Sequence, residues 1–290
     1  MSAAATLAPA GLPGISPDVY GPADFEAVAA IVHADAGIVL PQGKAMLVYS
    51  RLAPLVRTTG SMTFAAYIER IRQDPAERLR AVSALTTNHT YFYREAHHFL
   101  HFAEQVRPQL LARLNAGQPV RLWSAGCSSG EETWSLVLTL LGEDRITGKH
   151  IAARNLRVLA SDIAAHALER ANAATYPVGD LKDVPAVLRD LWTRSDSETA
   201  TIEREARAMV RFRTLNLLGD WPMQRRFDTI FCRNVMIYFD QPTKERLVAR
   251  FAEALVPGGH LYIGHSERVT GPAAALLSPV GPTIYRRKSA

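Results

Sequence analysis

The sequence predicts an α/β protein, in which a small all-helical domain precedes a doubly wound, Rossmann-like domain. Three observations support this fold class. Residues 22–85 carry helical patterns with no strand pattern among them. From residue 120 onward, short apolar strands alternate with helices, as in a largely parallel sheet with helices on both faces. At residues 120–132 an apolar strand runs into a glycine turn and a helix starts directly after it, which is typical of the nucleotide-binding corner of such a sheet.

We place the all-helical domain at residues 21–86. Its first helix is indicated by Phe25, Val28 and Val32, which recur at helical spacing after Asp24, a suitable N-cap. Further helices are expected at residues 42–56, 64–71 and 77–85. Residues 1–20 are rich in Ala, Pro and Gly and carry no basic segment. They are therefore expected to form a disordered tail and not a signal peptide.

The Rossmann-like domain is expected at residues 120–290, after a linker and helix at residues 87–119. Its strands are expected at residues 120–124, 155–160, 210–215, 228–232, 260–264 and 283–287, the last two ending the sheet. Helices are expected at residues 131–141, 163–173 and 242–255, with a loop around Gly148 and a helix stop at residues 257–259. Residues 177–209 are densely charged and loop-like, so we expect them to form a small inserted subdomain.

Composition narrows the class of protein. The chain is 48% hydrophobic, and its net charge is +5, but no block of like charges or aromatic–basic interleaving predicts nucleic-acid binding. No apolar run approaches the roughly 20 residues that span a bilayer, so no membrane insertion is expected. Two cysteines without a disulfide framework suit a reducing cytoplasm.

A mild basic concentration lies between residues 41 and 87, where seven Lys or Arg face three acids. It is either a solvated helical surface or a docking face for an acidic protein. Lys44, Arg51 and Arg57 are the candidate docking residues.

The glycine turn indicates which kind of cofactor binds. A dinucleotide site needs G-x-G-x-x-G, whereas here Gly126 and Gly130 enclose three residues, and Ser128 stands where the middle glycine would be. Glu131 and Glu132 follow at the helix start and would repel a phosphate there. A cofactor with a cationic end and no phosphate fits better, and S-adenosylmethionine is the common one.

Three further stretches carry a family resemblance: TTNHTYFYREAHHF at residues 86–99, FDTIFCRNVMIYFD at 227–240 and GGHLYIGHSE at 258–267. Together with the glycine turn, they closely resemble the CheR-type chemotaxis receptor methyltransferases. The resemblance covers residues 22–287, in the order of the family's motifs.

The resemblance implies methyl transfer from S-adenosylmethionine to glutamate side chains in the cytoplasmic methylation region of chemoreceptors. The products would be glutamate 5-O-methyl esters and S-adenosylhomocysteine. It also implies that residues 87–119 line the cofactor site and that Arg94 and Tyr238 are catalytic. The cofactor-binding residues implied by the family pattern are Asn88, Thr90, Arg94, Gly126, Glu131, Asp162, Asn216, Leu217, Arg233 and Asn234.

Physical chemistry is consistent with these assignments. Asp162 ends a strand, where an acid can accept hydrogen bonds from ribose hydroxyls. Glu131 is at the start of a helix, close to where the cofactor's ammonium or sulfonium would lie. Arg94 can clamp a carboxylate bidentately, and the carboxylate could belong to the cofactor or to the substrate glutamate. A glutamate, with a pKa of about 4.3, is already ionised at neutral pH, so neither a general base nor a metal is required.

One stretch departs from the family pattern. Members that tether themselves to a receptor's C-terminal pentapeptide use a glycine-containing loop in a small β-subdomain. The matching residues 193–205 contain no glycine and are about three residues shorter, so we expect this protein to bind receptors without that tether.

Alternative functions are a noncatalytic module that senses S-adenosylmethionine, a carboxyl methyltransferase of another acidic protein, and an NAD-dependent oxidoreductase. The complete set of Arg94, Asp162, Arg233 and Asn234 argues against the first, and the missing middle glycine against the last. Nothing in the sequence excludes another acidic substrate.

Overall fold

The computed structural model describes residues 19–289, and the described chain divides into two compact units after Thr86. Most of the tail expected at residues 1–20 lies outside the described residues. Its last residue, Tyr20, is fully buried, with its ring centroid 4.6 Å from that of Phe64 and 5.6 Å from that of Tyr49. The ordered chain therefore begins before residue 21.

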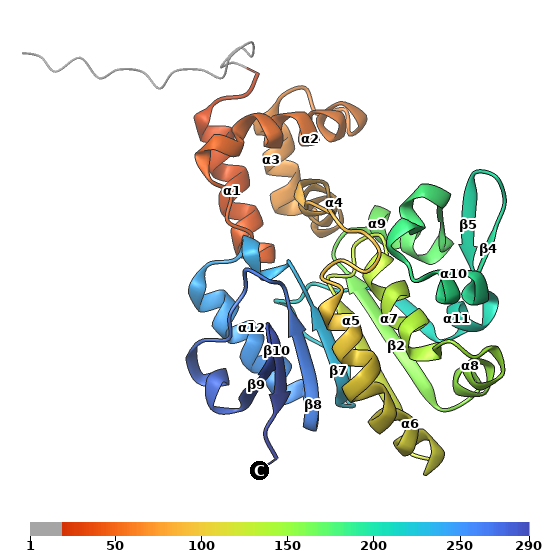
Figure 1. The fold of residues 1–290 in the computed structure, drawn as a ribbon. Helices are drawn as coiled ribbons and strands as arrows, with labels where there is room; N and C mark the ends of the chain where they lie inside the picture. Colours follow the sequence, from red (N-terminus) through yellow and green to blue (C-terminus); the bar gives the residue numbers. More distant parts are fainter. Residues whose placement is uncertain (1–18, 290) are drawn as a thin grey trace, which may run out of the picture. The chain divides into compact units, whose positions relative to one another are not determined.

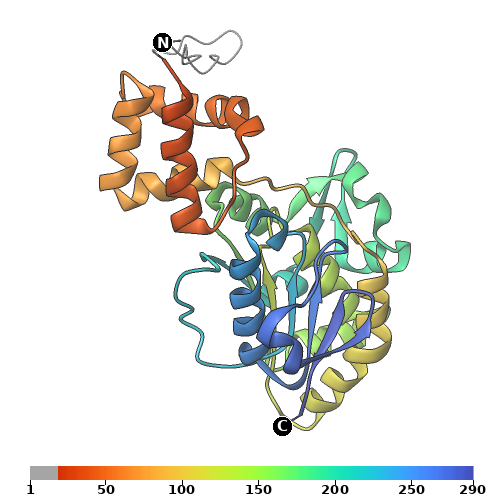
Figure 2. The same ribbon diagram turned by 90° about the vertical axis from the view of Figure 1, so that its left-hand side faces the viewer.

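The first unit is all-helical (Figure 2, red to orange). Its elements are α1 (Pro22–Ala36), the 3-10 turn η1 (Gln42–Lys44), α2 (Ala45–Thr58), α3 (Phe64–Gln73) and α4 (Pro75–Leu85). Phe25, Val28 and Val32 of α1 are buried. The prediction that Asp24 is the N-cap was wrong: Gly21 takes that place, and the Asp24 carboxylate accepts the Gly21 N–H at 2.8 Å. This is the half of a capping box in which an acid at the third helical position accepts the N–H of the N-cap residue.

The second unit is built on a seven-stranded sheet with the order β6-β2-β1-β7-β8-β10-β9 (Figure 1). Neighbouring strands from β6 to β8 are parallel, and β10 runs antiparallel to both β8 and β9. The fold class is confirmed. The strands are β1 (Val120–Ala125), β2 (Leu156–Asp162), β6 (Val210–Thr214), β7 (Phe227–Cys232), β8 (Leu255–Ile263), β9 (Leu277–Gly281) and β10 (Ile284–Arg287).

Helices cover both faces of this sheet. Figures 1 and 2 show α5 and α6 on one face and α12 on the other. The helical elements are α5 (His97–His101), the π-helical turn η2 (Phe102–Val106), α6 (Arg107–Asn115), α7 (Glu131–Leu141), α8 (Arg145–Ala152), α9 (Ala165–Ala173), η4 (Met236–Tyr238), α12 (Gln241–Ala254) and η5 (Gly271–Ala275). No helix within residues 19–289 is long and apolar enough to cross a membrane.

The expected inserted subdomain contains a second, three-stranded antiparallel sheet with the order β3-β5-β4. It consists of β3 (Thr175–Pro177), η3 (Val178–Asp183), α10 (Ala186–Trp192), β4 (Thr193–Ser195), β5 (Thr199–Ile202) and α11 (Arg204–Ala208). The β4–β5 turn closes without glycine because the Asp196 carboxylate accepts the backbone N–H groups of Glu198 and Thr199 at 2.8 and 2.7 Å.

Three sequence-based expectations in this unit were wrong. The loop around Gly148 is helix α8, in which a Cβ at Gly148 would lie 2.3 Å from the Trp192 ring, so glycine is needed there for packing. Residues 257–259 do not merely stop a helix: strand β8 starts at Leu255 and passes through them, with a register shift opposite β7. Strand β9 was not expected, and it forms the edge of the seven-stranded sheet next to β10.

Candidate functional site

The glycine turn follows β1 and has three residues in the left-handed region: Gly126 (φ 76°), Ser128 (φ 51°) and Gly130 (φ 96°). A Cβ at Gly126 would lie 2.3 Å from the side chain of Val235, so a larger residue does not fit. Ser128 tolerates its strained backbone because the Asp162 carboxylate accepts its N–H at 2.7 Å. The end of β2 thus fixes the turn after β1.

Asp162 is 8% exposed, and burial raises the pKa of its carboxyl while backbone hydrogen bonds oppose that rise. Oδ1 accepts the Ala164 N–H at 2.9 Å and Oδ2 accepts that of Ser128. A carboxylate has about four acceptor positions, so capacity remains for the hydroxyls that the sequence assigns to it.

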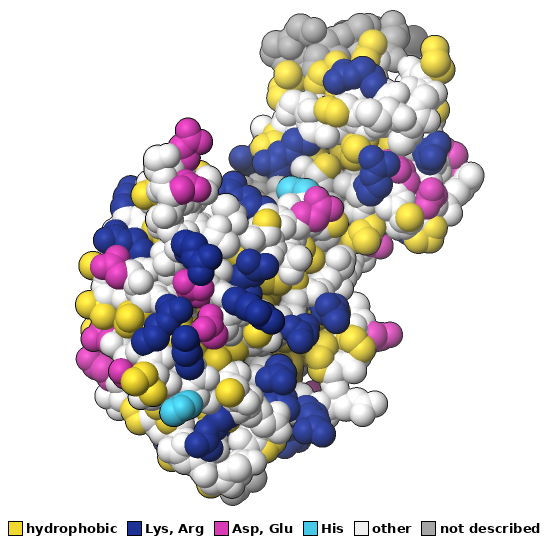
Figure 3. All heavy atoms as spheres, turned by 90° about the vertical axis from the view of Figure 1, so that its right-hand side faces the viewer, with side chains coloured by type: hydrophobic (Ala, Val, Ile, Leu, Met, Phe, Trp, Pro, Cys, Tyr) yellow, Lys and Arg dark blue, Asp and Glu magenta, His cyan; other side chains and the backbone are white. Residues whose placement is uncertain are grey.

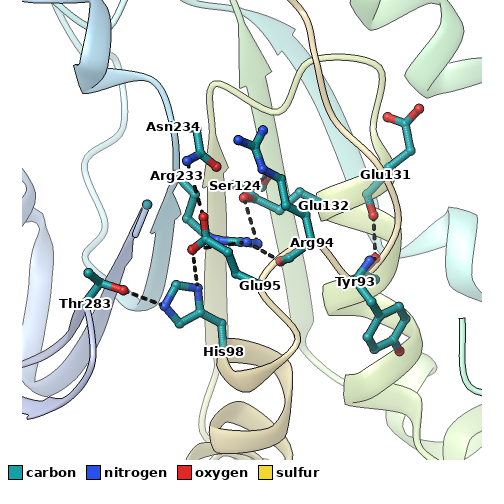
Figure 4. Close-up of polar contacts among 12 residues, drawn as sticks. Tyr93, Arg94, Glu95, His98, Ser124, Glu131, Glu132, Arg233, Asn234 and Thr283 are labelled. Atoms are coloured by element: carbon teal, nitrogen blue, oxygen red, sulfur yellow. Dashed lines mark hydrogen bonds and ion pairs between the residues drawn. The ribbon is translucent and has the colours of Figure 1, made fainter. Parts of the chain in front are cut away.

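Glu131 and Glu132 open α7, and their side chains have different partners. The Glu131 carboxylate accepts the Ser129 hydroxyl at 2.8 Å and lies 4.0 Å from Arg170. The Glu132 carboxylate accepts the Ser124 hydroxyl at 2.8 Å and lies 3.4 Å from Arg233 (Figure 4). Burial raises the pKa of both carboxyls. Glu131 thus lies beside the exposed Arg170 at the turn, whereas Glu132 belongs to a buried ion-pair network.

Arg233 is the centre of that network, and its side chain is 2% exposed. The guanidinium lies between the carboxylates of Glu132 and Glu95, the latter at 3.5 Å, and donates to the backbone carbonyl of Arg94. It also lies 5.4 Å above the centre of the Phe99 ring. Figure 4 shows how these side chains converge from β7, α7 and the segment before α5.

Glu95 links the network to two further segments. Burial alone raises the pKa of Glu95, but Arg233 and hydrogen bonds from His265 outweigh it and hold the pKa at about 2. Burial, together with Arg233, lowers the pKa of His98 to about 3. Its contact with Glu95 at 3.5 Å is therefore not an ion pair at neutral pH, and its Nε2 lies 2.9 Å from the Thr283 hydroxyl.

Arg94 lies between two residues with left-handed backbone, Tyr93 (φ 55°) and Glu95 (φ 58°). This unusual geometry is held by the Ser135 hydroxyl, which accepts the Tyr93 N–H at 2.9 Å, and by Arg233 on the Arg94 carbonyl. The Arg94 guanidinium donates to the His89 carbonyl at 2.8 Å and points away from Glu95 and Arg233 in Figure 4. Most of its five donors remain available.

A second clamp involves Asn234 and Glu267. Asn234 also has a left-handed backbone (φ 59°). Glu267 accepts its N–H at 3.3 Å and that of Gly264 at 2.5 Å, while the Asn234 amide donates to Glu95 at 3.3 Å. The turn at residues 264–267 thereby fixes residue 234. The roles of Glu95, Glu132 and Glu267 were missed from the sequence, although all three lie within or beside the quoted motifs.

The remaining predicted cofactor residues lie in loops of the same unit. The Asn88 amide lies 3.0 Å from His166 Nε2, and its carbonyl accepts the Ser128 hydroxyl at 3.1 Å. Thr90 is half-buried in the same segment. The Asn216 side chain accepts the Leu218 N–H at 3.0 Å, and Leu217 is buried. Tyr238 is half-buried at the end of η4.

The basic residues of the first unit differ in their contacts. Arg51 donates to the carbonyls of Ala84 and Thr86 at the end of α4, so it is not a free surface charge. Arg70, Arg72, Arg78 and Arg80 also contact carbonyl or carboxylate groups. Among the residues described, Lys44 and Arg57 are the exposed cations of this stretch for which no partner is seen.

These groups fit S-adenosylmethionine chemically. Asp162 and Glu131 offer carboxylate acceptors for hydroxyl and ammonium groups, and Arg94 offers donors for a carboxylate. In the part of the chain from residue 19 to 289, no group of three or more His, Cys, Asp or Glu could hold a metal ion.

Comparison with known families decides the assignment. Residues 23–86 match the model described as "CheR methyltransferase, all-alpha domain", and residues 88–281 match "CheR methyltransferase, SAM binding domain". The chain belongs to the CheR methyltransferase family. It is a methyltransferase that uses S-adenosylmethionine as its cofactor.

Curated relatives of this CheR methyltransferase match over most of their length. The "Probable chemotaxis protein methyltransferase" of Rhizobium etli is 41% identical over 88% of this chain and 96% of its own. "Chemotaxis protein methyltransferase 2" of Pseudomonas aeruginosa is 39% identical over 92% and 93%, respectively. The "Chemotaxis protein methyltransferase" of Escherichia coli is 37% identical over 84% of each chain.

Proposed function

We propose that this enzyme transfers the methyl group of S-adenosylmethionine to glutamate side chains in the cytoplasmic methylation region of chemoreceptors. The products are glutamate 5-O-methyl esters and S-adenosylhomocysteine, and the enzyme acts in the cytoplasm. The observation that carries the proposal is that relatives named chemotaxis protein methyltransferases align over most of this chain. The arrangement of Arg94, Asp162 and Arg233 gives the proposal a physical basis.

We assign cofactor binding to the residues around the glycine turn. Asp162 and Glu131 accept hydrogen bonds from hydroxyl and ammonium groups, and Gly126 lets the backbone approach the ligand closely. Asn88, Thr90, Asn216 and Leu217 complete this side of the site. When bound, S-adenosylmethionine supplies an electrophilic methyl group and its own leaving group.

The chain's contribution to catalysis is positioning. A glutamate carboxylate is ionised at neutral pH, so no residue has to remove a proton. Arg94 holds a carboxylate, either the substrate's or the cofactor's, and Tyr238 lies on the loop after β7 that also carries Arg233 and Asn234. Holding two reactants in line and excluding water from a well-hydrated nucleophile lowers the barrier. The hydrogen bond from Arg233 to the Arg94 carbonyl holds the backbone of residue 94, and most donors of the Arg94 guanidinium remain available.

Transfer of tritiated methyl from S-adenosylmethionine to receptor cytoplasmic domains tests the proposal. We expect label that mild alkali releases as methanol, because carboxyl methyl esters are base-labile. Tight binding of S-adenosylmethionine without transfer to any receptor domain would contradict the proposal, and would favour a cofactor sensor or another acidic substrate.

We further propose that receptor binding does not depend on a C-terminal pentapeptide tether. In support, the β4–β5 turn has no glycine and is closed by Asp196. Receptor domains with and without the pentapeptide should be methylated with KM values within about twofold of each other. A KM at least tenfold lower for the domain with the pentapeptide would overturn this proposal.

A further inference from the structure

We propose that the second unit carries a nucleotide-binding groove, separate from the methyl-transfer site, that takes a nucleoside diphosphate or triphosphate. The groove has a volume of about 390 Å³ and lies between α11 and the sheet-edge strand β6. We call it the arginine groove, after Arg204 and Arg207 of α11 and Arg211 and Arg213 of β6, which line it together with Phe212 and Asn172.

The charge of the arginine groove is not neutralised by the protein. All four arginines are exposed, and within residues 19–289 none of them lies in an ion pair with a carboxylate. The nearest acids along the chain, Glu203 and Glu205, contact other cations, namely Arg145, Lys149 and Arg194. Figure 3 views the side of the second unit that carries α8, α11 and the β4–β5 hairpin, and Lys and Arg side chains gather there. Four close guanidinium groups repel one another, so an anion in the groove lowers the free energy.

The hydrogen bonds of the groove favour a compact anion over an added peptide strand. Among the residues that the structure describes, strand β6 pairs only with β2, which leaves its other edge open. On that strand the Arg211 guanidinium donates to the Val210 carbonyl at 2.9 Å, and the Arg213 guanidinium donates to the Phe212 carbonyl at 2.7 Å. A peptide strand pairing with these carbonyls would have to displace both side chains. Each guanidinium has five donors, so most remain free for phosphate oxygens, which Arg binds bidentately.

An aromatic ring in the groove favours a nucleotide over a simple phosphate. Phe212 is half-exposed, and its ring centroid lies 5.6 Å from that of the buried Trp134. The ring is thereby held in place and presents an apolar surface beside the arginines. Asn172 adds an amide donor and acceptor. The volume lies within the range of about 300–1,000 Å³ of small-molecule sites.

Isothermal titration calorimetry of the full chain tests the proposal. The ligand is ADP, added to protein saturated with S-adenosylhomocysteine so that the adenine cannot enter the methyl-transfer site. We expect one ADP per chain with a Kd below about 1 mM, and at least about tenfold weaker binding of inorganic pyrophosphate. The variant R204Q/R207Q should bind ADP at least about tenfold more weakly, because two charge-assisted donors are lost.

The matched control is R189Q/R194Q, which removes one half-buried and one exposed arginine of the same subdomain outside the groove. It should bind ADP like the parent chain. Both variants should bind S-adenosylhomocysteine unchanged, which shows that they are folded. The proposal is overturned if S-adenosylhomocysteine abolishes ADP binding, if R204Q/R207Q binds ADP normally, or if pyrophosphate binds as tightly as ADP. None of these outcomes depends on the methylation of any receptor.

Discussion

Arg233 shows how a single residue can connect three segments far apart in the sequence. Its guanidinium contacts Glu132 at the start of α7, and Glu95 and the Arg94 carbonyl ahead of α5. Removing one partner of a buried ion pair leaves an uncompensated charge, and that loss costs more than an exposed pair ever contributes. We therefore regard Arg233 and Glu95 as positioning residues, which act on the reaction through Arg94.

Replacing Glu95 tests this role. Glu95→Gln should lower the free energy of unfolding at pH 7 by about 3 kcal/mol, because Arg233 loses a buried partner. Since folding depresses the pKa of Glu95 to about 2, its stabilisation is complete above about pH 4.5 and is lost as the pH falls through 2. Denaturant titrations at pH 7 and at pH 3 should therefore show a smaller pH dependence for the variant. Glu104→Gln, at an exposed position of η2, is the control and should match the parent chain.

Variants of Arg94 and Asp162 should distinguish effects on methyl transfer from effects on cofactor binding. Arg94→Ala should reduce methyl transfer at least about a hundredfold, because a bidentate carboxylate clamp is lost. Its affinity for S-adenosylhomocysteine should change less. Asp162→Ala should weaken that affinity at least about tenfold, because Ser128 also loses its hydrogen-bond acceptor. Calorimetry and the tritium assay measure the two effects. Full activity in both variants would show that the site is assigned to the wrong residues.

Among the elements, helix α4 gives Arg51 a structural role beside the predicted docking role. The last carbonyls of a helix lack intrahelical partners, and Arg51 donates to two carbonyls at the end of α4. Lys44 precedes α2 and Arg57 lies in its last turn, and both are exposed. These two residues are the better test of a docking face.

Charge substitutions in the first unit should therefore fall into two classes. Arg51→Ala should lower the free energy of unfolding by about 1–2 kcal/mol, because two carbonyls lose a donor. Lys44→Glu and Arg57→Glu should leave stability within about 0.5 kcal/mol but raise the KM for the receptor domain at low salt. The increase should shrink at ~0.5 M salt, where exposed charges are screened. An unchanged KM at low salt would show that this basic stretch is a solvated helical surface and not a docking face.

The accuracy of the sequence-based predictions differs from element to element. Helix α7 and strands β1 and β7 were predicted within a residue, because each is rich in apolar residues and has a sharp turn beside it. Strand β9 and helix α8 were missed, since β9 is short and mostly not buried and α8 contains Gly148. That glycine is explained by the Trp192 ring packed against it, a contact between residues 44 positions apart that local sequence patterns do not reveal.

The cofactor site could likewise be predicted only where its residues belong to a local sequence pattern. The glycine turn, Asp162 and the motif residues are recognisable as short patterns with a known chemistry. The pairs Arg233–Glu95 and Arg233–Glu132 join residues 138 and 101 positions apart. Their pairing follows from the parallel order of β1 and β7 in the sheet, so it requires the fold. The left-handed backbone at Tyr93, Glu95 and Asn234 is likewise a consequence of tertiary contacts, because none of the three is glycine.

At the scale of the whole molecule, two compact units with separate cores should unfold in two steps. All four tryptophans, Trp123, Trp134, Trp192 and Trp221, lie in the second unit. Tryptophan fluorescence therefore reports the unfolding of that unit alone, while the circular dichroism of helices reports both. S-Adenosylhomocysteine at 100 times its Kd should stabilise the second unit by about 2.7 kcal/mol. It should delay the transition that both probes report and leave the transition seen by circular dichroism alone unchanged.

Two of the variants described above should show which unit unfolds in each step. Arg51→Ala should shift the circular dichroism transition that has no fluorescence counterpart, and Glu95→Gln should shift the transition that both probes report. Each variant changes contacts within one unit only. If the two units have separate cores, each variant should therefore shift the unfolding transition of its own unit and leave the other transition unchanged. A single transition that coincides in both probes, and that moves with either variant and with S-adenosylhomocysteine, would show that the two units unfold as one cooperative structure.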